Sequence, residues 1–201
     1  YHMDEPLGDA SAVALYFLSK EAAGHVKVVL SGEGADELFG GYNIYREPES
    51  LKKIDWIPFG VRRVIGKLAA KLPDVKGRDF LIRAGMKVEE RFIGNAYIYR
   101  EKEKAQILKN KVTGPSTQEY LRPFFEELES ENRGLLQDME KMQSVDLRYW
   151  LPGDILQKAD KMSMAHSLEV RVPFLDKEVF DFAAKLPKEA KIAAGTTKYI
   201  F

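Results

Sequence analysis

The residues with the clearest chemical character form one short run, Ser-Gly-Glu-Gly-Ala-Asp-Glu at positions 31–37. Glycines let backbone N–H groups approach an anion closely, and the Ser31 hydroxyl adds a donor, which favours a phosphate. The carboxylates of Glu33, Asp36 and Glu37 would repel a polyphosphate unless a divalent cation lay between them. The run therefore indicates a nucleotide with Mg²⁺. The alternative is a turn in which Asp36 and Glu37 only open a helix and favour its positive end.

Basic side chains that could meet a phosphate or a carboxylate lie in the C-terminal part of the chain. The first 50 residues hold nine Asp or Glu against three Lys or Arg, so the remainder carries six excess positive charges. The candidates for charge-assisted hydrogen bonds are Lys158, Lys161, Arg171 and Lys198. The alternative for each lysine is a solvated helix face, and for Arg171 a structural pairing with Glu169 or Asp176.

Composition excludes several classes of function. The chain has no cysteine, which rules out disulfides, thiolate metal sites and cysteine nucleophiles within it and favours a cytoplasmic protein. The three histidines are far apart in sequence, which argues against a zinc site or a Ser-His-Asp arrangement. Lys plus Arg and Asp plus Glu number 31 each, so a nucleic-acid partner is not expected. The longest apolar run, 12–18, is too short to span a membrane.

The acidic glycine loop must be positioned by the elements before it. The pattern predicts a helix over 12–23, with Asp9 and Ser11 as capping residues and with Val13, Tyr16 and Phe17 on its apolar face. A strand over 25–30, apolar enough to be covered on both faces of a parallel sheet, follows it. Ligands in α/β sheets bind beyond the carboxyl ends of strands, so the site is expected at the loop.

Helical periodicity dominates the rest of the chain. Ser116 and Glu119 form a predicted capping box for one helix, and another strand is expected near 170–172. Helices are expected over 61–72, 78–99, 135–149 with Pro152 and Gly153 closing it, and 176–186, with a further one beginning at Gly195. The apolar stripe of the first of these consists of Val61, Val64, Ile65, Leu68 and Leu72. Because no repeat, linker or low-complexity tract interrupts the pattern, one domain with one core is predicted.

Three separated strings carry a family resemblance. VVLSGEGADELFGGY, residues 28–42, resembles the synthetase domain of the glutamine-hydrolysing (B-type) asparagine synthetases. YWLPGDILQKADKMSMAHSLEVRVPFLD, residues 149–176, is similar to the second signature of that family, and GTTKYI, residues 195–200, to its lysine-bearing motif. YHMDEPLGDASAVALYFLS, residues 1–19, matches the segment just upstream. The shared order implies an α/β fold, a partial adenine-nucleotide alpha-hydrolase-like (PP-loop ATPase) layer with a predominantly helical remainder.

The resemblance implies an ATP-dependent ligase of amino-acid biosynthesis. In that family ATP adenylates the side-chain carboxylate of aspartate, and ammonia from a glutaminase domain of the same full-length chain attacks the β-aspartyl-AMP. AMP makes the carboxylate oxygen a good leaving group, and Mg²⁺ stabilises the departing pyrophosphate. Homodimers occur in the family, so a second copy of the chain is one expected partner.

The resemblance also implies roles for individual residues. Asp36 is the expected Mg²⁺ ligand, with Ser31, Gly32 and Gly34 near the nucleotide or pyrophosphate. Catalytic roles fall to Glu33, near the acyl-adenylate and ammonia, to Lys198, which would neutralise phosphate charge, and to Lys161. Lys158 and Glu5 are expected to bind aspartate or the intermediate. The family often has Arg where Lys161 stands, and lysine lacks the bidentate fork of arginine.

The chain also departs from the family pattern. The phosphate loop of the family, a Ser-Gly-Gly-x-Asp-Ser string, is absent, as is the N-terminal glutaminase domain with its N-terminal cysteine. Residues 1–201 are therefore expected to be a fragment of the C-terminal synthetase domain and inactive alone. β-Lactam synthetases and lasso-peptide cyclases resemble the same domain and adenylate other carboxylates, which makes them an alternative. A noncatalytic helical interaction module is another.

Overall fold

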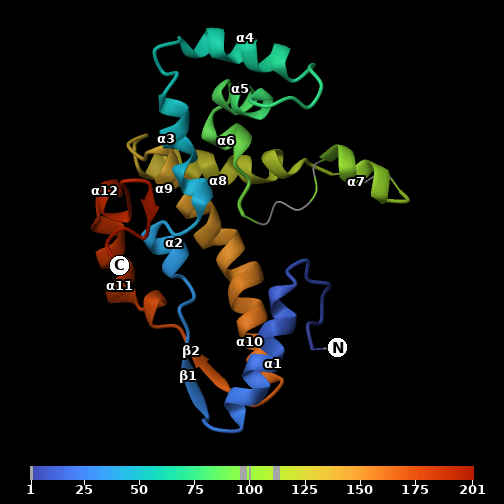
Figure 1. Cartoon of the computed structure of the whole chain (residues 1–201), viewed down its shortest axis with the longest axis vertical. Coiled ribbons are helices and arrows are strands. Elements are labelled where there is room, and N and C mark those ends of the chain that lie inside the picture. The colour runs from blue at the N-terminus through green and yellow to red at the C-terminus, as the bar shows by residue number, and fades with distance from the viewer. Residues whose placement is uncertain (1, 96–98, 100, 111–113) are drawn as a thin grey trace. The chain divides into compact units, whose positions relative to one another are not determined.

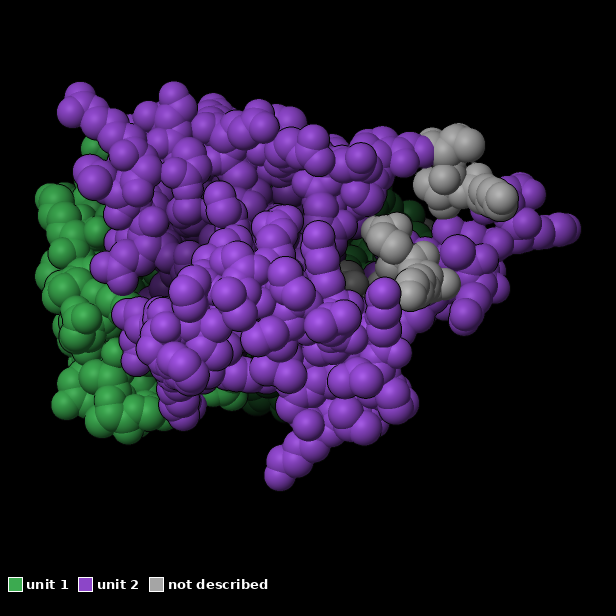
Figure 2. Space-filling view, turned by 90° about the horizontal axis from the view of Figure 1, so that it is seen from above, with its two compact units in different colours: residues 1–43, 143–201 green, residues 44–142 purple. Residues whose placement is uncertain are grey.

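Two segments far apart in the sequence form one unit of the chain, and the residues between them form the other. The computed structural model describes residues 2–95, 99, 101–110 and 114–201. Unit 1 comprises Tyr1–Asn43 and Gln143–Phe201, and unit 2 comprises Ile44–Met142 (Figure 2). The structure thus divides the chain into two compact units, and the prediction of one domain with one core stays a prediction. Both units are built mainly of helices, so no change of composition marks the crossings between them.

Unit 1 contains all the strands of the described residues (Figure 1). Its elements in chain order are α1 (Ser11–Ala23), β1 (Val28–Leu30), α2 (Ala35–Phe39), a π-helix (Asp146–Leu156), α10 (Gln157–Met164), β2 (Glu169–Arg171), a 3₁₀ turn (Pro173–Leu175), α11 (Lys177–Lys185), α12 (Lys188–Lys191), β3 (Ile192–Ala193) and β4 (Thr196–Thr197). The few short strands among many helices are compatible with the predicted helix-rich α/β class. No helix in the described ranges combines the length and apolar character that crossing a membrane requires.

β1 and β2 form a parallel pair that joins the two segments of unit 1. Val29 lies opposite Val170, and the ladder is extended by the Ser31 N–H, which donates to the Arg171 carbonyl at 2.8 Å. The second strand was therefore correctly expected. The expected cover on both faces was wrong, because Val28 and Leu30 are 42% and 74% exposed. Within the described residues the sheet has two strands, β1 and β2. The apolar side chains of β1 are therefore left largely uncovered there.

Helix α1 confirms the first predicted helix but not its apolar face. The Ser11 N–H donates to the Asp9 carboxylate at 2.8 Å, which satisfies one of the free donors at the helix start. Val13 and Phe17 are 64% and 62% exposed, so the predicted inward face is largely open. Tyr16, the third residue of that face, is half-buried, and its ring lies 4.4 Å from that of His166, just beyond α10.

The helix predicted to close at Pro152 and Gly153 continues through both residues. The π-helix Asp146–Leu156 contains them and runs directly into α10 (Figure 1). Proline lacks an N–H and normally disturbs an α-helix, and the stretch around Pro152 adopts wider π turns, which are rare and occur mostly within longer α-helices. This continuity places Asp154 at the end of the π-helix and Lys158 in the first turn of α10.

The helix expected from Gly195 onward is wrong, because this segment is half of a β-hairpin. β3 and β4 pair antiparallel, with Ile192 opposite Thr197 and Ala193 opposite Thr196. The turn residues Ala194 and Gly195 both have left-handed backbones, with φ of 48° and 78°. Two central residues with positive φ match the twist of a tight hairpin. Lys198 follows β4 directly.

Unit 2 is entirely helical in its described part. Its helices are α3 (Glu47–Lys52), α4 (Phe59–Ala69), α5 (Arg78–Ala84), α6 (Val88–Arg91), α7 (Glu101–Ile107), α8 (Thr117–Glu131) and most of α9 (Asp138–Val145), after a 3₁₀ turn over Asn43–Arg46. The capping box of α8 is confirmed, since the Ser116 N–H donates to Glu119 at 2.7 Å and the Glu119 N–H returns a bond to the Ser116 hydroxyl.

The single helix predicted over 78–99 is two short ones, α5 and α6. The break follows Gly85, where an added Cβ would lie 2.6 Å from the Arg62 carbonyl oxygen of α4. This close approach of backbones requires glycine, and glycine ends helices readily. Residues 96–98 of the predicted helix lie outside the described part. α4 itself packs through Gly66 and Ala69, so its predicted apolar stripe, which includes Val61, Val64, Leu68 and Leu72, is exposed.

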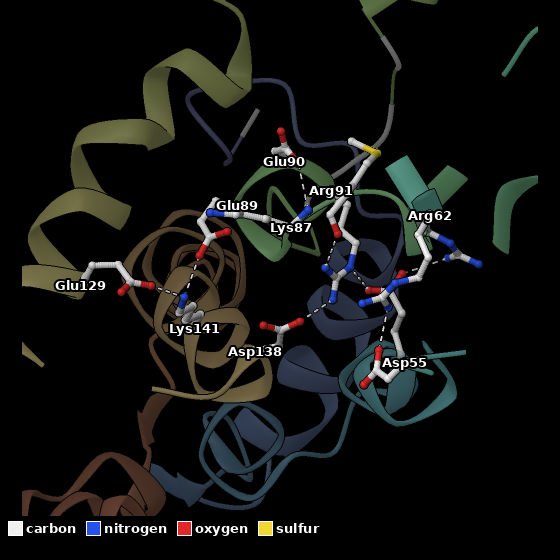
Figure 3. A network of polar contacts seen from close by, with 12 residues as sticks. Asp55, Arg62, Lys87, Glu89, Glu90, Arg91, Glu129, Asp138 and Lys141 are labelled. Carbon is white, nitrogen blue, oxygen red and sulfur yellow. Dashed lines mark hydrogen bonds and ion pairs between the residues drawn. The ribbon is translucent and has the colours of Figure 1, made fainter. Parts of the chain in front are cut away.

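Ion pairs link the short helices of unit 2 (Figure 3). The Arg91 guanidinium, 4% exposed, donates to Glu47 of α3 at 2.8 Å and to Asp138 of α9 at 2.7 Å. The Lys141 ammonium of α9 bonds Glu89 of α6 at 2.7 Å and also contacts Glu129 of α8. Short helices have little stability of their own, so these charged contacts, together with apolar packing, fix their arrangement.

Replacing Arg91 should destabilise unit 2 strongly. Arg91→Met leaves the nearly buried Glu47 carboxylate without its closest cation, and breaking such a pair from one side costs about 3–5 kcal/mol. Arg63→Met is the matched control, because its pair with Glu90 is about two-fifths exposed and worth about 0–1 kcal/mol. Hydrogen exchange of the α3, α6 and α9 peptides measures the difference. Equal protection in the two variants would contradict this role of Arg91.

Candidate functional site

The centre of the candidate site is an ion pair between α2 and the C-terminal hairpin. The Lys198 ammonium lies 2.9 Å from Asp36 Oδ1, and both side chains are about one-third exposed. Asp36 stands in the first turn of α2, directly after the loop that follows β1, and Lys198 directly after β4. The structure thus brings together two predicted residues that are 162 positions apart in the sequence.

Three aromatic rings hold the end of the chain against α2. The ring of Phe201 lies 4.8 Å from that of Phe39 in α2 and 5.7 Å from that of Phe174 in the 3₁₀ turn after β2. The rings of Phe39 and Phe174 are themselves 6.0 Å apart. Edge-to-face pairs of this kind add stability beyond the area they bury. The cluster keeps Lys198 near Asp36, and the sequence reasoning missed it because three phenylalanines at distant positions carry no spacing signal.

Glu33 lies in the same loop and is only partly accessible. Burial raises the pKa of its carboxyl, the nearby Lys158 opposes that shift, and the negative charges of Glu37 and Asp36 add to it. A carboxylate whose pKa is raised toward neutrality is better matched to accepting a proton than an ordinary one. The environment of Glu33 is therefore compatible with the predicted role of a general base.

Lys158 is a buried cation held by two carboxylates. Its side chain is 8% exposed, it lies 3.2 Å from Asp154, and it also bonds Asp9. Burial alone would lower the pKa of Lys158, but the hydrogen bonds to Asp9 and Asp154 outweigh burial and raise it. Lys158 is therefore charged and neutralised within the protein. The sequence reasoning did not identify Asp9 and Asp154 as its partners, although the four-residue spacing of Asp154 and Lys158 is a recognisable helical signal.

Lys161 and Glu5 are placed differently from each other. Lys161 pairs with Asp4, and that hydrogen bond raises the pKa of the lysine and lowers the pKa of Asp4. The acidic residue of the Asp-Glu-Pro string that reaches α10 is thus Asp4, one position before the predicted Glu5. Glu5 is exposed. The catalytic role expected of Lys161 and the substrate-binding role expected of Glu5 stay predictions.

The loop residues Ser31, Gly32 and Gly34 have distinct structural duties. The Ser31 N–H is already bonded to β2, which leaves its hydroxyl as the donor open to a ligand. Gly32 is exposed, and a Cβ there would meet nothing within 4 Å. Gly34 is buried with a φ of 87°, and a Cβ would lie 2.8 Å from Leu175 Cγ. Backbone conformation and packing therefore explain why residue 34 is a glycine.

A buried polar chain lies behind the loop. The Glu37 side chain is fully buried, and its Oε1 accepts a hydrogen bond from the Tyr42 hydroxyl at 2.7 Å. The Trp150 indole donates to the same hydroxyl at 3.3 Å, and Gln143 donates to the Glu37 carbonyl at 2.5 Å. Burial raises the pKa of the Glu37 carboxyl. Glu37 thus fixes α2 from inside, whereas its neighbour Asp36 faces outward.

The donor set suits a metal that arrives with its own ligands. Among the residues that the structure describes, no three His, Cys, Asp or Glu side chains converge as a metal-binding group. Magnesium is commonly held by one or two carboxylates together with substrate phosphates and water. Asp36, accessible and beside Lys198, fits this mode of binding, with the lysine available to the phosphates.

Comparisons with known proteins agree on one family. The asparagine synthase family model matches residues 1–201, so the chain belongs to that family. It is 51% identical over 201 residues to the glutamine-hydrolysing asparagine synthetase 1 of Bacillus subtilis, covering 100% of this chain and 31% of that protein. It is 46% identical to the Mycobacterium tuberculosis protein named "Putative asparagine synthetase (glutamine-hydrolyzing)", covering 99% of this chain and 30% of that protein. The chain thus spans about a third of the length of these relatives, and no solved structure matches it significantly.

The Asp9 to Lys158 pair should make the α1 and α10 region sensitive to acid. Burial would raise the pKa of Asp9, but the hydrogen bonds from Lys158 and Ser11 lower it from its ordinary 3.8 to about 2. The folded state therefore gains stability above pH 3.8 and loses it as the pH falls toward 2. Asp9→Asn should cost about 1–2 kcal/mol at pH 7, and this difference should shrink below pH 4.

Hydrogen exchange of peptides covering α1 and α10 between pH 7 and pH 2.5 measures this effect. Asp181→Asn is the control, because its 4.0 Å pair with Lys177 is exposed. A cost of Asp9→Asn that is the same at every pH would show that charge on Asp9 is not what stabilises this region.

Proposed function

We propose that the protein containing this chain is an ATP-dependent ligase that makes asparagine from aspartate. The observation that carries the proposal is the pairing of Asp36 with Lys198, which puts an accessible carboxylate and an ammonium side by side at the carboxyl end of β1. Membership of the asparagine synthase family supports this reading of the site. The names of the relatives add glutamine as the source of nitrogen.

In the proposed reaction different side chains of the site interact with the charged groups of ATP and of the intermediate. Mg²⁺ would supply stabilisation of the departing pyrophosphate. Asp36 would hold that ion, and Lys198 would pair with phosphate oxygens, where a charge-assisted bond is stronger than a neutral one. The Ser31 hydroxyl would add a donor beside Gly32.

Glu33 is the proposed proton acceptor when ammonia attacks the β-aspartyl-AMP intermediate. Its partly buried carboxyl has a raised pKa, which supports that assignment. Lys158, neutralised by Asp9 and Asp154, is proposed to shape the aspartate pocket and to act on Glu33 through its charge. Lys161 and Glu5 remain weaker candidates for contact with substrate. The glutaminase activity, the homodimer and the cytoplasmic location are further parts of the proposal.

Pyrophosphate exchange into ATP tests the proposal directly. The full-length protein, with Mg²⁺ and one carboxylic acid at a time, should exchange label only when aspartate is present. Asp36→Asn should reduce the rate by about 10²-fold or more, because one lost stabilising contact to the transition state costs about 2.7–4 kcal/mol. Asp176→Asn, at the start of α11, is a control for removing a carboxylate from unit 1.

The other outcomes identify the alternatives. Exchange that requires a different acid would indicate an adenylating relative such as a β-lactam synthetase or a peptide cyclase. No exchange with any acid, and no binding of Mg-ATP, would favour a noncatalytic helical module. Exchange by residues 1–201 alone would contradict the expectation that this part is inactive by itself.

A further inference from the structure

We propose that Lys198 is the resting counter-ion of the metal-binding carboxylate of Asp36, and that Gly41 is the positioning residue that lets the two meet. The inference rests on the proposed function, since it concerns the same Mg²⁺ site. It adds that the site without a ligand is already charge-paired. A divalent cation must therefore displace Lys198 from Asp36, which moves the lysine to where the phosphates arrive.

Packing around Gly41 is the first observation. A Cβ built on Gly41 would overlap Asp36 Oδ1 and the Lys198 Cε and would lie 2.6 Å from Asp36 Cγ. Gly41 is not among the residues with positive φ, unlike its neighbour Gly40 with φ of 71°. Backbone conformation therefore does not demand glycine at position 41, but an alanine there would push the side chains of the ion pair aside.

The backbone of Lys198 is the second observation. Its φ of 50° lies in the left-handed region, which costs a non-glycine residue energy and which the surroundings must maintain. The Tyr199 N–H donates to the Lys191 carbonyl at 2.9 Å, and the Phe201 N–H donates to the Lys198 carbonyl at 2.9 Å. The chain is thus bent around Lys198 with its side chain on Asp36.

Electrostatics supply the third observation. Glu33, Asp36 and Glu37 place three carboxylates in the loop after β1 and the first turn of α2. Lys198 is the cation in direct contact with Asp36 among the described residues. Without Lys198, this acidic group would attract a divalent cation before any nucleotide arrived. The lysine therefore links metal binding to nucleotide binding.

The inference is tested by measuring the binding of Mn²⁺ alone to the full-length protein. The electron paramagnetic resonance signal of the free ion reports how much Mn²⁺ is unbound. Lys198→Met should bind Mn²⁺ about threefold more tightly than the wild type, since an accessible ion pair of this kind is of modest strength. Lys198→Arg keeps the charge and should bind like the wild type. Gly41→Ala should bind about tenfold more weakly, because its Cβ displaces the carboxylate.

Matched controls separate these effects from general damage. Gly153→Ala adds a Cβ that meets nothing within 4 Å in the same unit, and it should leave Mn²⁺ affinity unchanged. A merely structural role for both residues would weaken binding in both the Lys198→Met and the Gly41→Ala variants. The opposite signs expected here are therefore diagnostic. Thermal melting of each variant verifies that it is folded.

Three results would overturn the inference. They are unchanged or weaker Mn²⁺ binding by Lys198→Met, unchanged binding by Gly41→Ala, and Mn²⁺ affinity that Asp36→Asn does not alter. Aspartate-dependent pyrophosphate exchange by the wild type distinguishes the two proposals. If the wild type exchanges label while one of these results appears, the resting pair is wrong and the ligase function stands. If exchange is absent from the wild type, the function itself fails.

Discussion

The parallel pairing of β1 with β2 is the constraint on which the candidate site depends. These strands are separated by about 140 residues of sequence, yet they lie in register from Val28 and Glu169 onward. The chain beyond β1 becomes the acidic loop and α2, and the chain beyond β2 becomes the turn that carries Phe174. Each later contact of the site, including the ring cluster on Phe39, requires the segments that follow β1 and β2 to lie side by side.

Three lysines of unit 1 are neutralised by nearby carboxylates, and this has a common physical basis. Lys158 meets two carboxylates, Lys161 meets Asp4, and Lys198 meets Asp36. Buried or crowded charges are costly unless they are paired. The proposed ligase function needs several cations for a polyphosphate and a dicarboxylic acid, and carboxylates pair with these cations while no ligand is bound. The pairs in the accessible part of the site are the ones that a ligand can exchange.

Local sequence patterns predicted what depends on neighbouring residues. The helix at 12–23, the capping box at Ser116 and the strand near 170 follow from spacing and were confirmed. The prediction that the apolar faces of α1 and α4 point inward was wrong. An apolar stripe indicates that a helix packs against a partner, but that partner need not lie within the described chain. The hairpin at 192–197 was missed because its turn, Ala194-Gly195, lacks the usual asparagine or aspartate.

Within the site, residue types were predictable and most partnerships were not. Asp36 and Lys198 were identified from motif strings, and their contact depends on a tertiary arrangement that no spacing encodes. Asp9 and Gly41 gave little signal, because each contacts a lysine far away in the sequence, whereas the four-residue spacing of Asp154 and Lys158 was a usable signal.

The division of the chain at Ile44 and Met142 bears on how such a domain can change over evolution. The chain leaves unit 1 just after α2 and returns to it within α9, so unit 2 is inserted between the two segments of unit 1. Insertions are tolerated best at exposed loop tips, such as those between the helices of unit 2. None of the residues of the β1 to β2 pairing or of the Asp36 to Lys198 contact belongs to unit 2. Divergence in size among homologous domains can therefore accumulate there without remodelling the chemistry.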